Sequence, residues 1–300
     1  MLLKKYSKIK RLGSSEVENI FARDEETIVV EEKLDGSNFR FWLEGGKLKF
    51  GSRRVNGVGS EQWEKIIQYL RENINRENLK KDVIYIGEAM RKHTINYNFD
   101  KIPKFIGYDV LEKKTGKPLN INESIELFHQ INLEFVEILF EGKVKEWFKE
   151  DIQQYLETSA YYDGKPEGIV IKNYNRLNKY NRPLFAKKVT ERFTEKKSKS
   201  DNTNHKPSKK NTEYIIEKYV TKARVRKIIN KLTLEEGEKL ERSLMQKLIP
   251  HVSEDVLQEE ILEIYSDSKV KKIDFRIFSQ LIPKKCIKVL DTMIEERQKV

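Results

Sequence analysis

The sequence contains a single cysteine, Cys286, among its 300 residues. One thiol excludes an intramolecular disulfide framework and a zinc site made of several thiolates. The sequence also has no apolar run of transmembrane length, and its first residues lack the apolar core of a signal peptide. We therefore expect a protein without a membrane segment, in the cytoplasm or another intracellular location.

Apolar residues are scarce as well, at 38% of the chain, whereas charged residues reach 36%. The chain is nevertheless long enough for two domains, each with its own core. The net charge of +11 and the isoelectric point near 9.3 favour a polyanionic partner, nucleic acid before a membrane surface. These values indicate a soluble protein with two domains, which we expect to be a monomer.

One lysine, Lys33, stands where a predicted strand meets a turn. Residues 27–30 before it are apolar and β-branched, residues 39–43 alternate in character, and the Asp-Gly-Ser-Asn sequence at 35–38 predicts the reversal between them. A lysine attacks only as the neutral amine, which requires burial or neighbouring cations that lower its pKa. The short pattern Lys-x-Asp-Gly fits a solvated lysine beside a hairpin equally well.

Further predicted strands each carry a polar or aromatic signal. The apolar or alternating runs that we read as strands are residues 47–50, 83–88, 105–110, 167–172 and 184–187. The side chains that mark them are Arg53, Glu88, Phe105, Tyr108, Glu167 and Lys187. Taken singly, each fits a surface charge or a core aromatic, but their fixed order on successive strands indicates a common site.

The pattern changes after Glu191. Residues 196–212 have almost no apolar content, which predicts a linker or mobile loop, and helical periodicity dominates beyond them. Thr233 and Glu236 have the spacing of a capping box before the next apolar helix, and Pro250 is expected to end that helix.

The ordered residues resemble the motifs of the covalent nucleotidyltransferase superfamily of ligases and mRNA capping enzymes, and within it the RNA ligase 2-type group of ATP-dependent RNA ligases. The resemblance covers roughly residues 25–195 and rests on the segments 32–38 (Glu-Lys-Leu-Asp-Gly-Ser-Asn), 52–53, 86–88, 105–110, 166–172 and 185–187. It implies an α+β fold: a nucleotidyltransferase domain of ATP-grasp-like antiparallel sheets with flanking helices, followed by an all-helical C-terminal domain. We expect these at residues 1–198 and 213–300, with a basic linker at 199–212.

The resemblance also implies a chemistry. Lys33 would attack the α-phosphorus of ATP and form a lysyl-adenylate; AMP would pass to an RNA 5′-phosphate, and a 3′-hydroxyl would then displace it. Lys187 would face the phosphate, and Glu167 and Asp35 would hold Mg²⁺, or Mn²⁺ in its place. Further roles in ATP binding would fall to Glu32 at the adenine edge, Asn38 and Arg53 at phosphate or sugar, Glu88 at the ribose, and Tyr108 or Phe105 on the base.

One motif departs from the family pattern. The last motif commonly carries two lysines separated by one residue, whereas here Lys187 is followed by Lys188 and Val189. We expect Lys187 to be the functional lysine, with the role of Lys188 undecided.

The RNA would meet the second domain. Residues 191–231 contain thirteen Lys and Arg against five Asp and Glu, a net charge of +8, so we expect phosphate contacts from Lys222, Arg224, Arg226 and Lys227. A solvated linker with a charged helix would have the same composition. RNA ends or a nicked RNA duplex are the expected substrates, because a DNA ligase or capping guanylyltransferase would carry a β-barrel domain there. Those two enzymes, and a nucleic-acid-binding protein without catalysis, remain alternatives.

Overall fold

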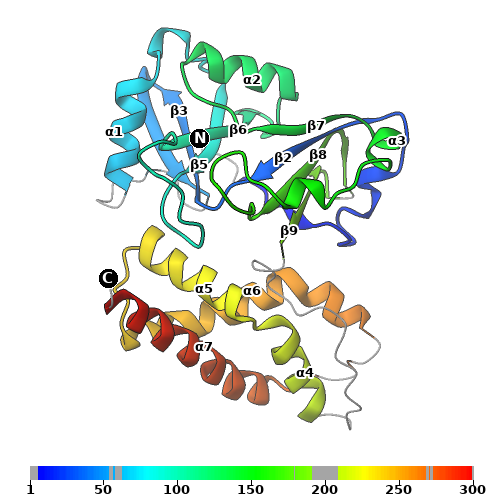
Figure 1. Cartoon of the computed structure of the whole chain (residues 1–300), viewed down its shortest axis with the longest axis vertical. Coiled ribbons are helices and arrows are strands. Elements are labelled where there is room, and N and C mark those ends of the chain that lie inside the picture. Colours follow the sequence, from blue (N-terminus) through cyan, green and yellow to red (C-terminus); the bar gives the residue numbers. More distant parts are fainter. Residues whose placement is uncertain are drawn as a thin grey trace. The chain divides into compact units, whose positions relative to one another are not determined.

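The computed structural model describes residues 6–53, 57, 63–178, 180–190, 209–267, 270 and 273–298. The chain divides into two compact units, Met1–Thr190 and Glu191–Val300 (Figure 1). Most of the predicted linker at 199–212 lies outside the described residues, since the description resumes at residue 209, where the first helix of the second unit begins.

A five-stranded sheet forms one half of the first unit. Its strands, in spatial order, are β1 (Lys10–Arg11), β9 (Pro183–Val189), β8 (Gly168–Leu177), β2 (Thr27–Lys33) and β7 (Ile138–Lys143). Neighbouring strands are antiparallel except β1 and β9, which run parallel. The outer face of this sheet buries alternate apolar residues, among them Val30, Ile169 and Ala186, with the short helices η1 (Glu18–Phe21), α3 (Val144–Trp147) and η4 (Gln154–Leu156) nearby.

A four-stranded antiparallel sheet forms the other half. Its order is β4 (Lys47–Ser52), β3 (Ser37–Glu44), β5 (Val83–Ala89) and β6 (Phe105–Glu112). Gly45 and Gly46 make the β3–β4 turn with φ of 57° and 72°, a conformation that favours glycine. The outer face packs on helices α1 (Glu64–Asn73) and α2 (Ile121–Gln130) through a core rich in aromatic rings (Figure 1).

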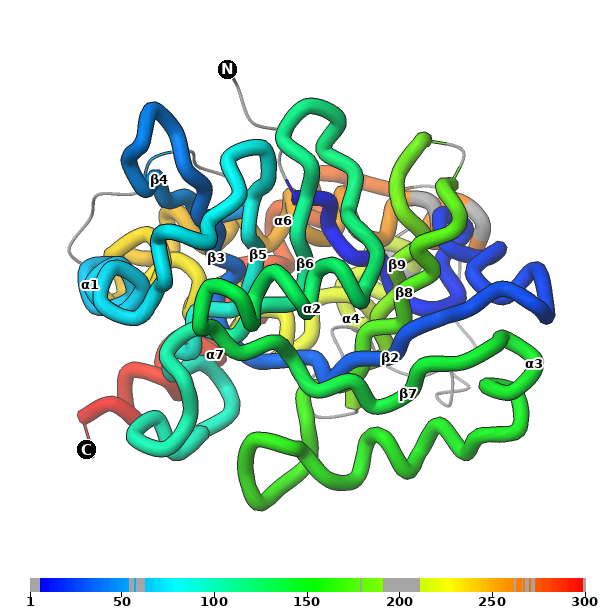
Figure 2. Tube along the Cα trace, turned by 90° about the horizontal axis from the view of Figure 1, so that it is seen from above, coloured from blue at the N-terminus to red at the C-terminus, as the bar shows by residue number. Residues whose placement is uncertain are grey.

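The inner faces of the two sheets meet at a buried lysine. Lys172 of β8 donates from Nζ to the carbonyl oxygen of Tyr108 on β6 at 2.6 Å, and the same Nζ lies 3.1 Å from Asp109. Glu31 on β2 accepts from Lys172 at 2.8 Å. In Figure 2, β2, β8 and β9 lie side by side, and β3, β5 and β6 of the other sheet lie next to them. A buried cluster of charged residues therefore joins the inner faces of the two sheets.

The second unit is helical in its described part. Its helices are α4 (Lys209–Tyr219), α5 (Lys222–Asn230), α6 (Met245–Ser266) and α7 (Phe275–Gln298), with short helical turns η6 (Lys231–Glu235) and η7 (Arg242–Leu244). They share one core, which includes Ile229, Leu248, Val256 and Ile282. The expected α+β class with a helical C-terminal part is confirmed.

Two local predictions in this unit are wrong. Thr233 caps no helix: it lies within η6, and its hydroxyl donates to the carbonyl oxygen of Ile229. Pro250 does not end a helix, because α6 continues through it for sixteen more residues. Val252 and Val256 are fully buried, so packing compensates for the hydrogen bond that the proline removes.

Candidate active site

Lys33 is the last residue of β2 and lies directly across from Gly168, the first residue of β8. Its Nζ lies 2.6 Å from Oε2 of Glu167, and the side chains of this ion pair are 22% and 15% exposed. A Cβ on Gly168 would stand 2.1 Å from the carbonyl oxygen of Lys188, so only glycine permits this close approach of the strands. The predicted nucleophile Lys33 and the predicted metal ligand Glu167 are thus in contact at the end of strand β2.

Opposing influences act on the protonation of this pair. Burial lowers the pKa of Lys33, but the negative charges of Glu167, Glu88 and Asp35 outweigh it, and the pKa is raised. The pKa of Glu167 is also raised, by burial first, against the positive charges of Lys33 and Lys187. Without a counter-charge on these carboxylates, Lys33 is held as an ammonium group and is not a nucleophile.

The Asp-Gly turn after Lys33 is fixed by the connection between β5 and β6. Oδ2 of Asp35 accepts from the backbone N–H groups of Thr94 at 2.7 Å and Ile95 at 2.6 Å, and the Asp35 N–H donates to the Tyr97 hydroxyl at 3.1 Å. This geometry makes Asp35 an anchor of the turn. A metal ion at Oδ2 of Asp35 would have to compete with these two hydrogen bonds.

A hydrogen bond between Gly36 and Glu88 joins the four-stranded sheet to the turn after Lys33. The Gly36 N–H donates to Oε1 of Glu88 at 3.1 Å. A Cβ on Gly36 would lie 2.6 Å from the carbonyl oxygen of Ala89, which explains the glycine. Glu88, predicted to serve the ribose, therefore lies beside the lysine motif.

Tyr108, and not Phe105, belongs to the inner face of the four-stranded sheet. Nδ2 of Asn38 donates to the Tyr108 hydroxyl. Burial and the charge of Glu88 raise the Tyr108 pKa, and the charge of Arg53 opposes them, so these groups gather around one ring. Phe105 is fully buried in the core beneath α1 and α2, and it does not face the site. From this position Phe105 cannot stack on a base in the site, which corrects that expectation.

Glu32 faces away from Lys33. Its strand partner Ile169 points into the outer core, and side chains directly opposite in antiparallel strands share a face. The carboxylate is 2% exposed and accepts from the Ser159 hydroxyl at 2.5 Å and the Ala160 N–H at 2.7 Å. Burial raises its pKa. The expected contact of this carboxylate with an adenine edge is not supported, because both oxygens bind the loop before β8.

Sheet register separates the two lysines of β9. Lys187 pairs with Val170, which pairs with Glu31, two residues before Lys33, so Lys187 shares the Lys33 face. Lys188 pairs with Ile169 and lies on the opposite face. Val189 returns to the Lys33 face, opposite Gly168. The structure thus gives Lys187, and not Lys188, the position that faces the site.

Two groups of polar residues were missed in the sequence. One is the buried cluster around Lys172, where the Tyr6 and Tyr174 hydroxyls donate to Asp109. Burial and the Asp109 charge raise the pKa of Glu31 in this cluster, although the positive charge of Lys172 opposes them. The other is the segment 93–97 that holds Asp35. Its position directly after the Glu88 strand was the only sequence signal for it.

Metal ligands are few in this site. Among the described residues, no group of three or more His, Cys, Asp or Glu side chains is arranged to hold a metal ion. Carboxylate oxygen is nevertheless the donor that Mg²⁺ and Mn²⁺ prefer, and excess negative charge surrounds Lys33. A divalent ion fits this site if substrate or water supplies its remaining ligands.

The predicted RNA contacts divide into exposed and buried residues. Lys222 and Lys227 are exposed on α5, and Arg226, whose side chain is 36% exposed, pairs with Glu296 at 2.6 Å. Arg224 is fully buried and forms ion pairs with Asp255, Glu259 and Glu260 of α6. The expectation for Arg224 is therefore wrong, since a residue enclosed by three carboxylates is not available to a phosphate backbone.

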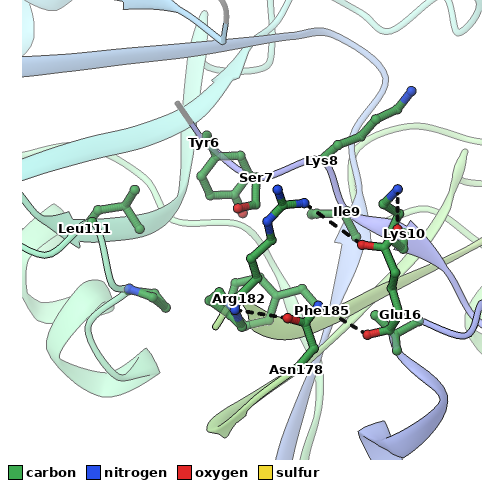
Figure 3. Close-up of a pocket in the computed structure, with 14 residues that line it drawn as sticks. Tyr6, Ser7, Lys8, Ile9, Lys10, Glu16, Leu111, Asn178, Arg182 and Phe185 are labelled. Atoms are coloured by element: carbon green, nitrogen blue, oxygen red, sulfur yellow. Dashed lines mark hydrogen bonds and ion pairs between the residues drawn. The ribbon is translucent and has the colours of Figure 1, made fainter. Parts of the chain in front are cut away.

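A separate pocket of about 40 Å³ opens between the segment before β1 and the β8–β9 hairpin (Figure 3). Glu16 lines this pocket, and its Oε1 lies 2.7 Å from Nζ of Lys10. The backbone carbonyl oxygen of Glu16 accepts from Nδ2 of Asn178 at 3.3 Å. None of the predicted site residues lines this pocket.

In the part of the chain that the structure describes, no helix is long and apolar enough to cross a membrane.

Comparisons with known proteins identify one family. The model of the RNA ligase family matches residues 26–190, more than half of the chain. Structures of a Naegleria gruberi RNA ligase with ATP and Mn, and with pyrophosphate, are each 17% identical, with TM-scores of 0.47 and 0.46. They cover 63% and 61% of this chain, which matches 56% and 55% of theirs. No curated protein matches. By the family match, this chain belongs to the RNA ligase family.

Proposed function

We propose that this protein is an ATP-dependent RNA ligase that joins a 5′-phosphate to a 3′-hydroxyl through a lysyl-adenylate. The observation that carries the proposal is the position of Lys33 at the end of β2, in contact with Glu167 and on the face of Lys187, within the family-matched residues. ATP is the expected nucleotide, and the Naegleria RNA ligase was solved with ATP and with AMP.

In the first step, the Lys33 amine attacks the α-phosphorus of ATP. The Nζ–P bond forms, the bond to the bridging oxygen of the β-phosphate breaks, pyrophosphate leaves, and Lys33 gives up a proton. Glu167 is the nearest base, at 2.6 Å. Lys187 faces the phosphate with a positive charge, which stabilises the charge that develops there.

The nucleoside would lie between the sheets. Tyr108 stacks on the base, Glu88 accepts from the ribose hydroxyls, and Arg53 holds phosphate. Asn38 fits a sugar contact, because its buried Oδ1 has no hydrogen-bond partner among the described residues and suits a hydroxyl donor. Glu32 acts at a distance by holding the loop that leads to Glu167.

A divalent ion, Mg²⁺ or Mn²⁺, would bind at Glu167. When bound, it would offset the carboxylate charge that raises the pKa of Lys33. Asp35 is the second candidate ligand, but one of its oxygens already accepts two backbone hydrogen bonds. We therefore assign the main protein contact to Glu167.

The first unit would carry nucleotide transfer and the helical unit would bind RNA ends or a nicked RNA duplex. We assign the phosphate contacts to Lys222, Arg226 and Lys227, and Arg224 does not contribute because it is buried.

The test is incubation of protein free of bound AMP with α-labelled ATP and Mg²⁺, followed by a denaturing gel. A covalent band supports the proposal, and its absence contradicts it. A band with GTP instead would indicate a capping enzyme, and sealing of nicked DNA in preference to nicked RNA would indicate a DNA ligase.

A further inference from the structure

Tyr97 lies in the connection between β5 and β6 and is 2% exposed. Its hydroxyl oxygen accepts from the N–H of Asp35 at 3.1 Å, in the turn that follows Lys33. The same connection holds this turn a second time, because the N–H groups of Thr94 and Ile95 donate to the Asp35 carboxylate. Tyr97 therefore helps to fix the backbone two residues after Lys33.

The ring of Tyr97 contacts a second segment, the loop before β8. Its centroid lies 5.3 Å from that of Tyr162, and the angle between the two planes is 76°. This is the edge-to-face geometry that aromatic pairs prefer. One buried side chain thus touches the turn after Lys33 through its oxygen and the loop before Glu167 through its ring.

Tyr162 closes that loop onto itself. Its hydroxyl donates to the carbonyl oxygen of Lys165, and its ring covers Gly164, where a Cβ would lie 2.5 Å from Cε2. The N–H of Ser159 donates to the carbonyl oxygen of Gly164 at 2.8 Å. Lys165 stands only two residues before Glu167. The position of the Tyr162 ring therefore limits where the Glu167 backbone can lie.

The five-stranded sheet holds the beginning of the same loop. Glu32 on β2 accepts from the Ser159 hydroxyl and from the Ala160 N–H. The N–H of Glu137, the residue before β7, donates to the Tyr161 hydroxyl at 2.8 Å. Tyr97 adds a contact from the connection between two strands of the other sheet. The loop before Glu167 is therefore held from both sheets.

We propose that Tyr97 and Tyr162 are positioning residues that set the contact between Lys33 and Glu167. The Tyr97 hydroxyl holds the turn after the lysine, and the pair of rings holds the loop that leads to the carboxylate. The effect on reaction rate rests on the proposed lysyl-adenylate chemistry, in which Glu167 is the nearest base and the metal ligand. A displaced carboxylate should slow that step, because the reacting groups must be held in a productive geometry.

The first experiment measures the contact itself, without ATP. A carbodiimide activates carboxylates and joins them to amines that they touch, and mass spectrometry measures the Lys33–Glu167 cross-link. The surface pair of Lys143 and Glu25, also 2.6 Å apart, is the internal reference.

Replacement of either tyrosine should change this cross-link in a defined order. Tyr162→Leu and Tyr97→Leu should each lose most of the Lys33–Glu167 cross-link relative to the reference. Tyr162→Phe retains the ring contact and should keep most of it. Tyr97→Phe also retains the ring but removes the acceptor for the Asp35 N–H, so its loss should be intermediate.

The second experiment measures the single-turnover rate of lysyl-adenylate formation over a range of ATP concentrations with Mg²⁺. Tyr162→Leu should lower the saturated rate about 10- to 100-fold and change the ATP concentration for half-saturation less. Tyr162→Phe should recover most of the rate.

The matched control is Phe135→Leu. Phe135 is another half-buried aromatic residue in an edge-to-face contact, 5.5 Å from Phe128 in the outer core of the four-stranded sheet. This variant should leave the cross-link and the rate unchanged, and thermal unfolding of each variant is measured alongside.

A wild-type cross-link ratio in both leucine variants of the tyrosines overturns the inference. An equal loss in Phe135→Leu or in Tyr162→Phe also overturns it, since the ring contact would then not be the cause. If the wild-type protein forms no adenylate, the proposed function fails, whereas the cross-link still decides the inference because it needs no ATP.

Discussion

Lys33 in the first unit and Arg224 in the second are cations in similar surroundings. The negative charges of Glu167, Glu88 and Asp35 act on Lys33, and Arg224 pairs with three acids of α6. Their exposure differs: the Lys33 side chain is 22% exposed, whereas that of Arg224 is 0% exposed. One cation is open to a ligand and the other is enclosed by its own protein.

The two cations also differ in chemistry. An ammonium group can lose a proton and become a nucleophile when its surroundings change, whereas a guanidinium group stays charged at any physiological pH. The lysine at the strand end can therefore react once the charge of its carboxylate neighbours is offset. An arginine among carboxylates inside a helical unit fixes α5 to α6. We propose that similar charge arrangements serve catalysis in the first unit and stabilise the fold in the second.

Removal of the Lys33 cation should have the largest effect. We expect Lys33→Ala to abolish labelling by α-labelled ATP and the overall joining reaction, while sealing of a pre-adenylylated strand continues, because only the first step uses the amine. Lys33→Arg should fail in the same way, since arginine is not deprotonated. Lys188→Ala is the matched control on the opposite face of the sheet and should label normally. Adenylate formation by Lys33→Ala at the wild-type rate would show that another lysine reacts.

Removal of the enclosed cation should change stability and not nucleotide chemistry. Arg224→Ala removes the buried partner that Asp255, Glu259 and Glu260 share, which should cost about 3–5 kcal/mol in the free energy of unfolding of the helical unit. Chemical denaturation followed by circular dichroism measures it. Arg226→Ala, which removes a surface pair with Glu296, should cost only about 0–1 kcal/mol. Equal losses of stability in the two variants would contradict a structural role for the enclosed Arg224.

A change at Glu167 should sharpen the difference in protonation. The Glu167 charge is the first of those that raise the Lys33 pKa, and burial acts against it. In ligand-free Glu167→Gln the pKa of Lys33 should fall, so its reaction with an amine reagent should begin at lower pH than in the wild type. Mass spectrometry of the labelled peptide measures this midpoint. Because Glu88 ranks second, Glu88→Gln should give a smaller shift, and a shift to higher pH would contradict the assignment.

The smallest effect should come from the exposed cations of α5. Neutralising Lys222, Arg226 and Lys227 together should weaken RNA binding and reduce the slope of log K against log salt by about one unit for each phosphate that the variant no longer neutralises. Titrations at several salt concentrations test this, with adenylate formation as the control that should not change. An unaltered slope would show that these cations are solvated and that RNA binds elsewhere on the protein.

The sequence by itself determined the strands and the position of Lys33 at the end of one of them. The β-branched run before Lys33, the Gly45-Gly46 turn and the apolar runs before Glu88 and after Glu167 depend on local periodicity and turn chemistry, and all of them form as expected. The helical character of the C-terminal part was also visible in its periodicity. Such features need only residues that are close in the chain.

Tertiary structure decided which side chains share a face and which are enclosed. Glu32 and Lys188 have suitable chemistry, but register places them opposite Ile169 and away from the site. Arg224 appeared to be an exposed cation because its three acids lie more than thirty residues ahead in the chain. In each case the deciding partner is distant in sequence. Composition and residue spacing do not predict such a contact, because it exists only after the chain has folded.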